Sequence, residues 1–381
     1  MEHIVIAIDS FKGSLSSLAA GQVASDAVRA VFPQARVEIF PLADGGEGTV
    51  DTLVEGLQGQ IVPAVVTGPL KAPVTSRYGL VPAEKLAVIE MADAAGLPMV
   101  PVEKRNPLQT TTYGLGELIL QAIDAGCREF IIGIGGSATN DCGLGMLTAL
   151  GWKFLKADGS PAGICGGDLA DVAAIDGSRV DARLKECQFR IACDVTNPLY
   201  GSQGCSAVFG PQKGATPEIV KVMDEAIHHF ADLAEKELGA IGAAVPGAGA
   251  AGGLGFAFRT FLGGELTPGT ELCLETIGIR QALETADLLI TGEGRMDRQT
   301  AMGKGPAGVA QLAHKLNPKI KTVAVCGCAL PDAEQVNQHG IDAYFPILHM
   351  PMTAEAAMEE KTTRLNLKQT VMQILRLTKK K

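Results

Sequence analysis

The sequence predicts an α/β protein, with a Rossmann-like domain formed by both chain ends and a second α/β domain inserted into it. At both ends, apolar strand patterns alternate with helix patterns, which is typical of a doubly wound parallel sheet. In between, residues 61–91 hold three short strand patterns with few helix residues between them, which indicates a mixed sheet. The 381 residues suffice for two or three domains. We expect residues 1–60 and 286–381 to form the first domain and residues 61–285 the inserted domain.

The first sixty residues predict two strand–helix pairs. An apolar run at 4–8 is the kind of strand that a parallel sheet buries on both faces. Ser16 or Ser17 can cap the helix that follows, and Pro33 ends it. The second pair is a strand at 36–40 and a helix at 48–57.

The inserted domain alternates less regularly. Pro217 opens a long amphipathic helix, because proline suits the first helical position, whereas residues 158–187 lack a clear period. The expected strands lie at 61–67, 74–80, 85–91, 129–134 and 189–193, with an extended segment at 152–156. The expected helices lie at 116–125, 141–150 and 217–238.

The last hundred residues return to regular strand–helix alternation, which completes the first domain. The expected strands lie at 288–291, 322–325 and 344–347, and the expected helices at 306–316, 332–339 and 353–377. The final three lysines predict a solvated tail.

The composition excludes several classes of function. The 33 basic and 42 acidic residues give a net charge of −9, which argues against a nucleic-acid or anionic membrane surface. The nine cysteines include no Cys-x-x-Cys pair, so we expect free thiols rather than a disulfide framework, with a zinc site as the minor alternative. The first nine residues read as a strand rather than a signal peptide, and the longest uncharged run is broken by Pro246. We therefore expect a cytoplasmic protein without a membrane span.

Glycine is enriched and gathers in loops that follow predicted strands. It makes up 46 of the 381 residues, about 12% against a usual ~7%. In a doubly wound sheet, ligands bind beyond the carboxyl ends of the strands, so these loops predict one shared site. The loops span residues 9–14, 43–49, 135–141, 194–198, 292–297 and 326–328.

Acidic and basic side chains in these loops favour magnesium-nucleotide chemistry. Asp9 and Lys12 lie three residues apart at the end of the first strand, where the lysine can neutralise a phosphate and the acid can orient it or bind magnesium. Asp44 and Glu47 flank two glycines and can hold magnesium or substrate hydroxyls. Each pair can instead serve only the adjoining helix N-terminus. The same chemistry is offered by Asp194, Glu293, Asp297 and the forked anion binder Arg295.

Two glycine loops and one lysine suggest phosphate contacts. Residues 133–138 match Gly-x-Gly-x-x-Ala between a strand and a helix, a context that also suits a dinucleotide. Residues 247–252 match Gly-x-Gly-x-x-Gly, either as a ligand loop or as a close packing turn. Lys304 precedes a helix and can meet a phosphate or remain solvated. A Walker-type P-loop, a Gly-x-Ser-x-Gly motif and a histidine in any of these strand-end loops are all absent from the sequence, which disfavours those NTPase and hydrolase classes.

Six segments resemble the type-1 glycerate kinases, and the resemblance runs from about residue 4 to beyond residue 350. They cover residues 9–15, 43–49, 133–141, 193–199, 246–255 and 291–297. The resemblance implies ATP-dependent phosphorylation of D-glycerate to 2-phosphoglycerate with Mg²⁺, in glyoxylate or aldarate breakdown, in a cleft between two α/β domains. The chain departs from the family pattern at Ile8, where proline is frequent, at Cys142, where glycine is expected, and at Cys328, where serine is common.

Membership of these motifs supports the loops as functional, and the types of residue in them suggest the individual roles. The expected catalytic residues are Asp194, Lys12, Asp9, Arg295 and Asp297, with Asp194 as the preferred general base and Asp9 or Asp297 as alternatives. The residues expected to bind substrate or phosphate are Ser10, Asp44, Gly45, Gly46, Glu47, Gly135, Gly136, Ser137, Thr139, Asn140, Asn197, Gly249, Gly252, Glu293 and Lys304. Asp141 and Asp44 are the candidates for Mg²⁺ bound with ATP.

Other interpretations of the sequence stay open. A nicotinamide-dependent dehydrogenase of a small hydroxy acid would use residues 133–138, and a non-enzymatic binding module would bind without turnover. Beyond the small-molecule substrate and ATP we expect no nucleic-acid or membrane partner, and either a monomer or a homodimer.

Overall fold

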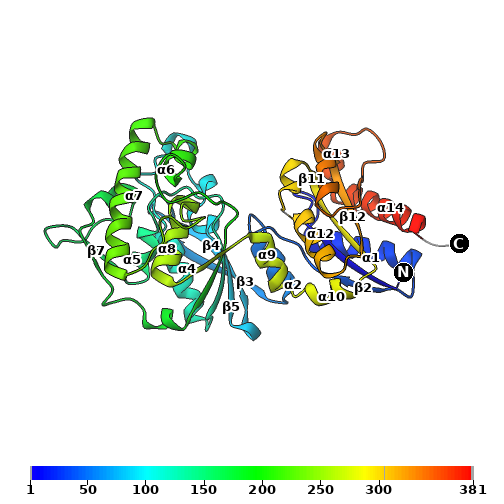
Figure 1. Cartoon of the computed structure of the whole chain (residues 1–381), viewed down its shortest axis with the longest axis horizontal. Coiled ribbons are helices and arrows are strands. Elements are labelled where there is room, and N and C mark those ends of the chain that lie inside the picture. The colour runs from blue at the N-terminus through cyan, green and yellow to red at the C-terminus, as the bar shows by residue number, and fades with distance from the viewer. Residues whose placement is uncertain (1, 304, 379–381) are drawn as a thin grey trace. The chain divides into compact units, whose positions relative to one another are not determined.

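The computed structural model describes residues 2–303 and 305–378, and the chain divides into two compact units (Figure 1). Unit 1 consists of Met1–Asp44, Glu55–Gln58 and Thr270–Lys381, and unit 2 of Gly45–Val54 and Gly59–Gly269. In Figure 1, unit 1 therefore joins the blue start of the chain to its yellow and red end, whereas unit 2 is mostly cyan and green. Among the described residues, no helix is long and apolar enough to cross a membrane.

Unit 1 contains a five-stranded parallel sheet with the order β13-β12-β11-β1-β2. Its strands are β1 (His3–Ile8), β2 (Arg36–Ile39), β11 (Leu288–Met296), β12 (Lys321–Ala329) and β13 (Ala343–Pro346). Every residue of β1 is buried, because this strand lies between β2 and β11 and is covered on both faces. All five strands point the same way, so their carboxyl ends meet at one edge of the sheet.

Helices cover both faces of this sheet. The helices of unit 1 are α1 (Ser17–Val31), α9 (Gly269–Thr276), α10 (Arg280–Thr285), α11 (Arg298–Ala301), α12 (Gly305–Leu316), α13 (Ala354–Met358) and α14 (Glu360–Thr378). Ile4 and Ile6 pack in one core with α1 and α14, whereas Val5 and Ala7 pack in another with α10 and α12. Alternate residues of one strand thus feed two cores, which is the doubly wound arrangement that the sequence predicts.

Unit 2 contains a six-stranded mixed sheet with the order β10-β9-β6-β5-β4-β3. Its strands are β3 (Gln60–Thr67), β4 (Pro73–Val81), β5 (Leu86–Glu90), β6 (Glu129–Gly133), β9 (Gln188–Ala192) and β10 (Glu265–Thr267). The pairs β3–β4 and β4–β5 are antiparallel and the others are parallel, so the α/β class and the mixed sheet are confirmed. A separate antiparallel pair joins β7 (Lys153–Leu155) and β8 (Ala174–Asp176).

The helices assigned to unit 2 include one long amphipathic helix. They are α2 (Thr49–Gly56), α3 (Ala92–Ala95), α4 (Tyr113–Asp124), α5 (Leu144–Ala149), α6 (Cys205–Phe209), α7 (Pro217–Leu238) and α8 (Leu254–Leu262). The hydroxyl of Thr216 accepts the N–H of Ile219 and caps α7, and Gly239 ends this helix at a left-handed φ of +65°. Its apolar side packs into a core around Phe230 and Phe154.

Several predicted boundaries are wrong for identifiable reasons. The helix expected from residue 141 begins at Leu144, because Cys142 and Gly143 have left-handed φ values of +50° and +72°. The helix expected at 353–377 is two helices, since Glu359 has extended backbone between them. The helix expected at 332–339 is a 3₁₀ helix, and α8, α9, α10 and β10 were not predicted.

The strand β11 is longer than the sequence suggests. It pairs with β12 as far as Met296 and Ala329, beyond the predicted end at residue 291. Glu293 and Arg295, expected in a loop, therefore lie on the strand itself and take their direction from the sheet pleat.

Candidate active site

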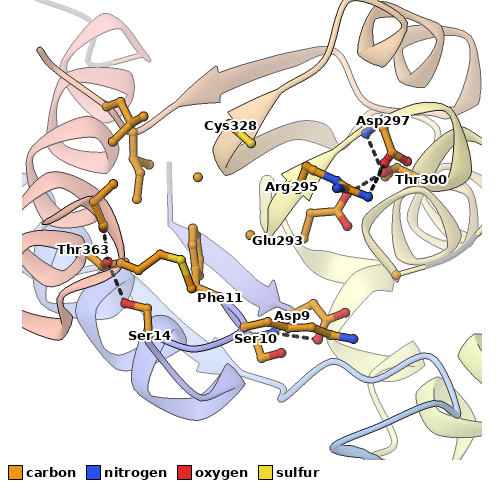
Figure 2. Close-up of a pocket in the computed structure, with 18 of the residues that line it drawn as sticks. Asp9, Ser10, Phe11, Ser14, Glu293, Arg295, Asp297, Thr300, Cys328 and Thr363 are labelled. Atoms are coloured by element: carbon orange, nitrogen blue, oxygen red, sulfur yellow. Dashed lines mark hydrogen bonds and ion pairs between the residues drawn. The ribbon is translucent and has the colours of Figure 1, made fainter. Parts of the chain in front are cut away.

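Unit 1 holds a pocket of about 660 Å³ at the carboxyl edge of its sheet (Figure 2). Of the residues expected in the site, it collects Asp9, Ser10, Lys12, Asp44, Glu293, Arg295 and Asp297. The strand ends place them together because β1 and β11 are parallel neighbours. Their position after parallel strands is therefore the feature of the sequence that predicts that these segments meet.

Asp9 lies at the end of β1 with its carboxylate turned toward other acids. The pKa of Asp9 is raised to about 6, mainly by burial and also by the carboxylate of Asp44, while the N–H of Ser10 and the ammonium of Lys12 oppose the shift. The Ser10 N–H donates to Asp9 Oδ1 over 2.6 Å. A carboxylate with a pKa near neutrality is able to accept a proton or to bind a cation.

Glu293 contributes a second carboxyl group with a raised pKa to the same pocket. The pKa of Glu293 is raised to about 7, mainly by burial and also by the charges of Asp9, Asp297 and Asp44. The hydroxyl of Thr300 donates to Glu293 Oε1 over 2.6 Å. The pocket therefore concentrates negative charge that a cation would relieve.

Arg295 and Asp297 interact with each other and with the local helix. Arg295 Nη2 lies 3.3 Å from Asp297 Oδ2, and the Arg295 side chain remains 65% exposed. Asp297 also caps α11 by accepting the N–H of Gln299. Asp297 thus has a structural role in addition to its place in the pocket, while Arg295 can turn toward an anion.

Unit 2 holds a second pocket, of about 600 Å³, lined by glycine backbone and acids. From the predicted set it collects Gly45, Gly46, Glu47, Gly135 and Gly136. Gly45 has φ +83°, and a Cβ there would lie 2.7 Å from Ala192 Cβ, so only glycine fits. The carbonyl of Gly45 in turn approaches Gly133 so closely that a side chain at 133 would collide with it. The two glycine loops therefore share one wall of this pocket.

Glu90 and Asp93 line the second pocket and were not among the predicted site residues. Glu90 ends β5 and is 6% exposed, and its Oε1 accepts the N–H of Val50 over 2.8 Å. Burial raises the pKa of Glu90 to about 7. Asp93 pairs with Arg77, which also binds Asp51 through both guanidinium nitrogens at 2.6 and 2.7 Å. An acid at the end of an apolar strand was the available sequence signal for Glu90.

A buried lysine supports the loop that follows β6. Lys213 is 2% exposed, and its ammonium donates to Ser137 Oγ over 2.7 Å and to the carbonyl of Thr139 over 2.6 Å. Burial lowers the pKa of Lys213 to about 8. Among the ion pairs that the described residues form, none includes Lys213, so its charge is held by these two dipoles. No local sequence pattern marks this residue, because its partners lie more than seventy positions away.

Thr139, Asn140 and Asp141 are fully buried and line neither pocket. Asp141 accepts the N–H and the hydroxyl of Thr112 and the N–H groups of Gly143 and Gly145. Burial raises the pKa of Asp141, although these four hydrogen bonds act to lower it. Its oxygens are thus occupied by donors that fix the entry to α5, which disfavours the metal-binding role that we expected of it.

The glycines at 249 and 252 serve close packing in the structure. A side chain at Gly249 would collide with the Pro198 carbonyl, and one at Gly252 with the Thr139 carbonyl. The N–H of Gly249 donates to the Asn197 carbonyl, and Asn197 Nδ2 donates to the Gln203 carbonyl. These residues join loops to one another, which agrees with the packing alternative rather than a direct ligand contact.

Asp194 follows β9 and is exposed. Its Oδ1 accepts the N–H of Gly269 over 2.8 Å, which orients the carboxylate. Asp194 lines neither of the two pockets. The predicted Lys304 lies outside the described residues.

The cysteines are free thiols with very different exposure. Cys328 is exposed in the pocket of unit 1, whereas Cys142 is fully buried, and burial raises its pKa well above the ordinary value. Cys142 occupies a left-handed conformation, which gives a physical reason for the glycine expected at this position. Among the described residues, no group of three His, Cys, Asp or Glu side chains forms a ready-made metal site.

Comparisons with known proteins agree on one family. The sequence pattern of the glycerate kinase family matches residues 4–379. A glycerate kinase of Bacillus subtilis is 49% identical over 93% of both chains, and a glycerate 2-kinase of Escherichia coli is 47% identical over 91% of this chain and 90% of its own. A solved structure from Salmonella typhimurium LT2, described as a presumed glycerate kinase 2, has a TM-score of 0.90 at 44% identity and covers 99% of this chain and 98% of its own.

Proposed function

Because the chain belongs to the glycerate kinase family, we propose that it transfers the terminal phosphoryl group of ATP to the 2-hydroxyl of D-glycerate. It is a kinase, and this membership replaces the dehydrogenase and binding-module alternatives. The observation that carries the proposal is the match over nearly the whole chain, which includes the residues of both pockets. The 2-phosphate product is supported by the name of the Escherichia coli relative.

Magnesium fits the acids of the unit 1 pocket. Asp9, Asp44 and Glu293 offer hard oxygen ligands, and burial, together with the charges of neighbouring carboxylates, raises the pKa values of Asp9 and Glu293. Mg²⁺ is usually held by one or two carboxylates together with substrate phosphates, so a complete protein cage is not needed. When bound, Mg²⁺ would offset phosphate charge during transfer. We propose that Asp44 and Asp9 hold it.

The net charge of −9 must be overcome locally for two anionic substrates. Two like charges at ~4 Å repel by ~4 kcal/mol at an effective dielectric of ~20. Lys12 and Arg295 are exposed and line the unit 1 pocket, so both can reach a phosphate. We propose that they bind and orient the phosphates, since phosphoryl transfer depends mainly on positioning and charge stabilisation.

Asp194 is the general base that we propose for the 2-hydroxyl, with Asp9 as the alternative. The hydrogen bond from Gly269 fixes the Asp194 carboxylate at the end of β9. For Asp9, the pKa of about 6 is suited to proton transfer near neutral pH. Asp297 is the weakest of the three candidates, because its carboxylate caps α11 and pairs with Arg295.

A coupled assay of ADP release tests the reaction, and phosphorus NMR identifies the product. We expect ADP only when both D-glycerate and Mg²⁺ are present, and a resonance of 2-phosphoglycerate rather than 3-phosphoglycerate. Release of ADP without a phosphorylated glycerate, or no release at all, would contradict the proposal.

Single substitutions test the base. Asp194→Asn should lower kcat by ~10²–10⁴ at saturating ATP, D-glycerate and magnesium, since general bases contribute that much. The matched control is Asp158→Asn, because Asp158 is an exposed turn residue that only accepts from Ser160. A fall of less than ~10-fold in Asp194→Asn would contradict the proposal that Asp194 is the base.

The remaining expectations stay predictions. They are an active site that uses residues of both units, a cytoplasmic location, a monomer or homodimer, and a role in glyoxylate or aldarate breakdown.

A further inference from the structure

The pocket of unit 1 has two chemically different walls (Figure 2). One wall carries the acids and Arg295 described above. In Figure 2, Phe11 and Thr363 lie on the opposite side from Glu293, Arg295 and Asp297. The apolar lining residues of the pocket are Phe11, Ile347, Leu348, Ala354, Ala357 and Met358.

Part of the apolar wall is exposed to solvent. Met358 is 47% and Leu348 39% exposed, whereas Phe11 and Ile347 are buried at 4% and 3%. Large apolar side chains that line a concave site and remain in contact with water favour an apolar ligand surface. The pocket volume of about 660 Å³ lies within the ~300–1,000 Å³ typical of small-molecule sites.

Hydrogen bonds hold this wall in place. The hydroxyl of Ser14 donates to Thr363 Oγ1 over 2.7 Å, and the Thr363 hydroxyl donates to the carbonyl of Ala357 over 3.0 Å. Ser14 follows β1, Ala357 belongs to α13 and Thr363 to α14, so three segments are tied together at the apolar side. A preformed surface of this kind costs little ordering when a ligand binds.

The two substrates of the proposed reaction differ in what they can use. D-glycerate is a small polar acid with no face that an apolar wall would recognise. ATP has a flat, weakly polar base at one end and charged phosphates at the other. The pocket of unit 2 is lined mainly by glycine backbone and by Glu47, Glu90 and Asp93, with Met99 as its one long apolar side chain.

Building on the proposed function, we infer that the adenosine part of ATP binds in the apolar half of the unit 1 pocket, between Phe11 and the segment from Ile347 to Met358. The phosphates then extend toward Asp9, Lys12 and Arg295 on the opposite wall. This assigns the nucleotide to unit 1 and leaves the glycine-lined pocket of unit 2 for the other substrate.

Chemical labelling of Cys328 tests the site in the unmodified enzyme. Cys328 is exposed in this pocket, so iodoacetamide labels it and mass spectrometry follows the rate. We expect MgADP to slow labelling at least fivefold and D-glycerate alone to leave the rate unchanged. Cys187, half-buried in unit 2, serves as the internal reference.

A pair of double variants tests the apolar wall itself. Leu348→Gln with Met358→Gln removes two apolar surfaces without adding charge, and should raise KM for ATP at least tenfold while KM for D-glycerate stays within twofold. The matched control is Met350→Gln with Leu365→Gln, since these residues are 65% and 55% exposed but do not line the pocket. All four side chains are exposed, so the variants should fold.

Nucleotide binding at this site requires both a raised KM for ATP in the double variant and slower labelling of Cys328 in the presence of MgADP. An unchanged KM for ATP in the Leu348 and Met358 double variant, or labelling of Cys328 that MgADP does not slow, would overturn it. A wild-type enzyme that makes no ADP from ATP and D-glycerate would contradict the proposed function instead, and the labelling experiment on the same protein would still decide the nucleotide site.

Discussion

Replacing Glu90 by glutamine should stabilise unit 2 at alkaline pH and not at acidic pH. Burial raises the pKa of Glu90 from its ordinary 4.5 to about 7, so the folded chain binds this proton more tightly than the unfolded chain. The contribution of Glu90 to stability is therefore fully present below pH ~4.5 and is lost as pH rises through ~7. A difference of about 2.5 pKa units corresponds to about 3 kcal/mol, of which about 2.5 kcal/mol falls between pH 5 and pH 8.

The variant Glu90→Gln removes the ionisation but keeps an oxygen that can accept the N–H of Val50. The free energy of unfolding of the variant relative to the wild type should thus rise by about 2.5 kcal/mol from pH 5 to pH 8. Urea unfolding followed by tryptophan fluorescence measures this difference, because Trp152 is the only tryptophan and belongs to unit 2.

The control for this experiment is Glu117→Gln. Glu117 also accepts one backbone N–H, from Thr67, but it is less buried than Glu90. It corrects for the general effect of exchanging a carboxylate for an amide at a hydrogen-bonded position. If Glu90→Gln changed stability equally at both pH values, Glu90 would titrate normally and the assignment of a desolvated carboxyl would be wrong.

Three further substitutions have defined outcomes. Lys213→Met should lower kcat/KM at least tenfold with little change in Tm. Two buried acceptors lose a donor at ~1–3 kcal/mol each, but a desolvated ammonium is removed as well, so the two effects on stability offset each other. Kinetics within twofold of wild type would refute this. Asp141→Asn should cost about 3 kcal/mol in urea unfolding, since an amide nitrogen would then face N–H donors, and a neutral result would refute it. Thr216→Ala should cost about 1 kcal/mol in the same assay through loss of the α7 cap, and an unchanged midpoint would contradict the cap.

Local patterns were sufficient to predict much of the architecture. The apolar run of β1 is buried on both faces, and Ser16, one of the two predicted caps, accepts the N–H of Ala19. These features depend on residues close together in the sequence, where periodicity and capping rules apply. The position of Asp9, Gly45 and Gly135 in pockets likewise follows from the rule that strand ends gather at one edge.

Other features of the site depend on contacts between segments that are far apart in the sequence, so local patterns do not predict them. Thr139 and Asn140 belong to a motif of the family, yet Gly252 packs against them and buries both. The role of Lys213 depends on partners in another loop. The apolar wall at Leu348 and Met358 is recognisable only once α13 and α14 are placed beside the segment that follows β1. Glu90 is different, because it ends an apolar strand and the rule for strand ends therefore predicts a site position for it.

The placement of β1 sets an order of events during synthesis of the chain. Its neighbour β11 begins 280 residues after β1 ends, and at ~5–20 residues per second the ribosome needs about 15 to 55 s to make that stretch. All residues of unit 2 precede Thr270, so unit 2 can fold while one edge of β1, which is apolar over residues 4–8, still lacks its partner strand. The interior strand β1 is thus made long before its pairing with β11 can be completed, and the nascent chain must keep it from pairing with other chains in the interval.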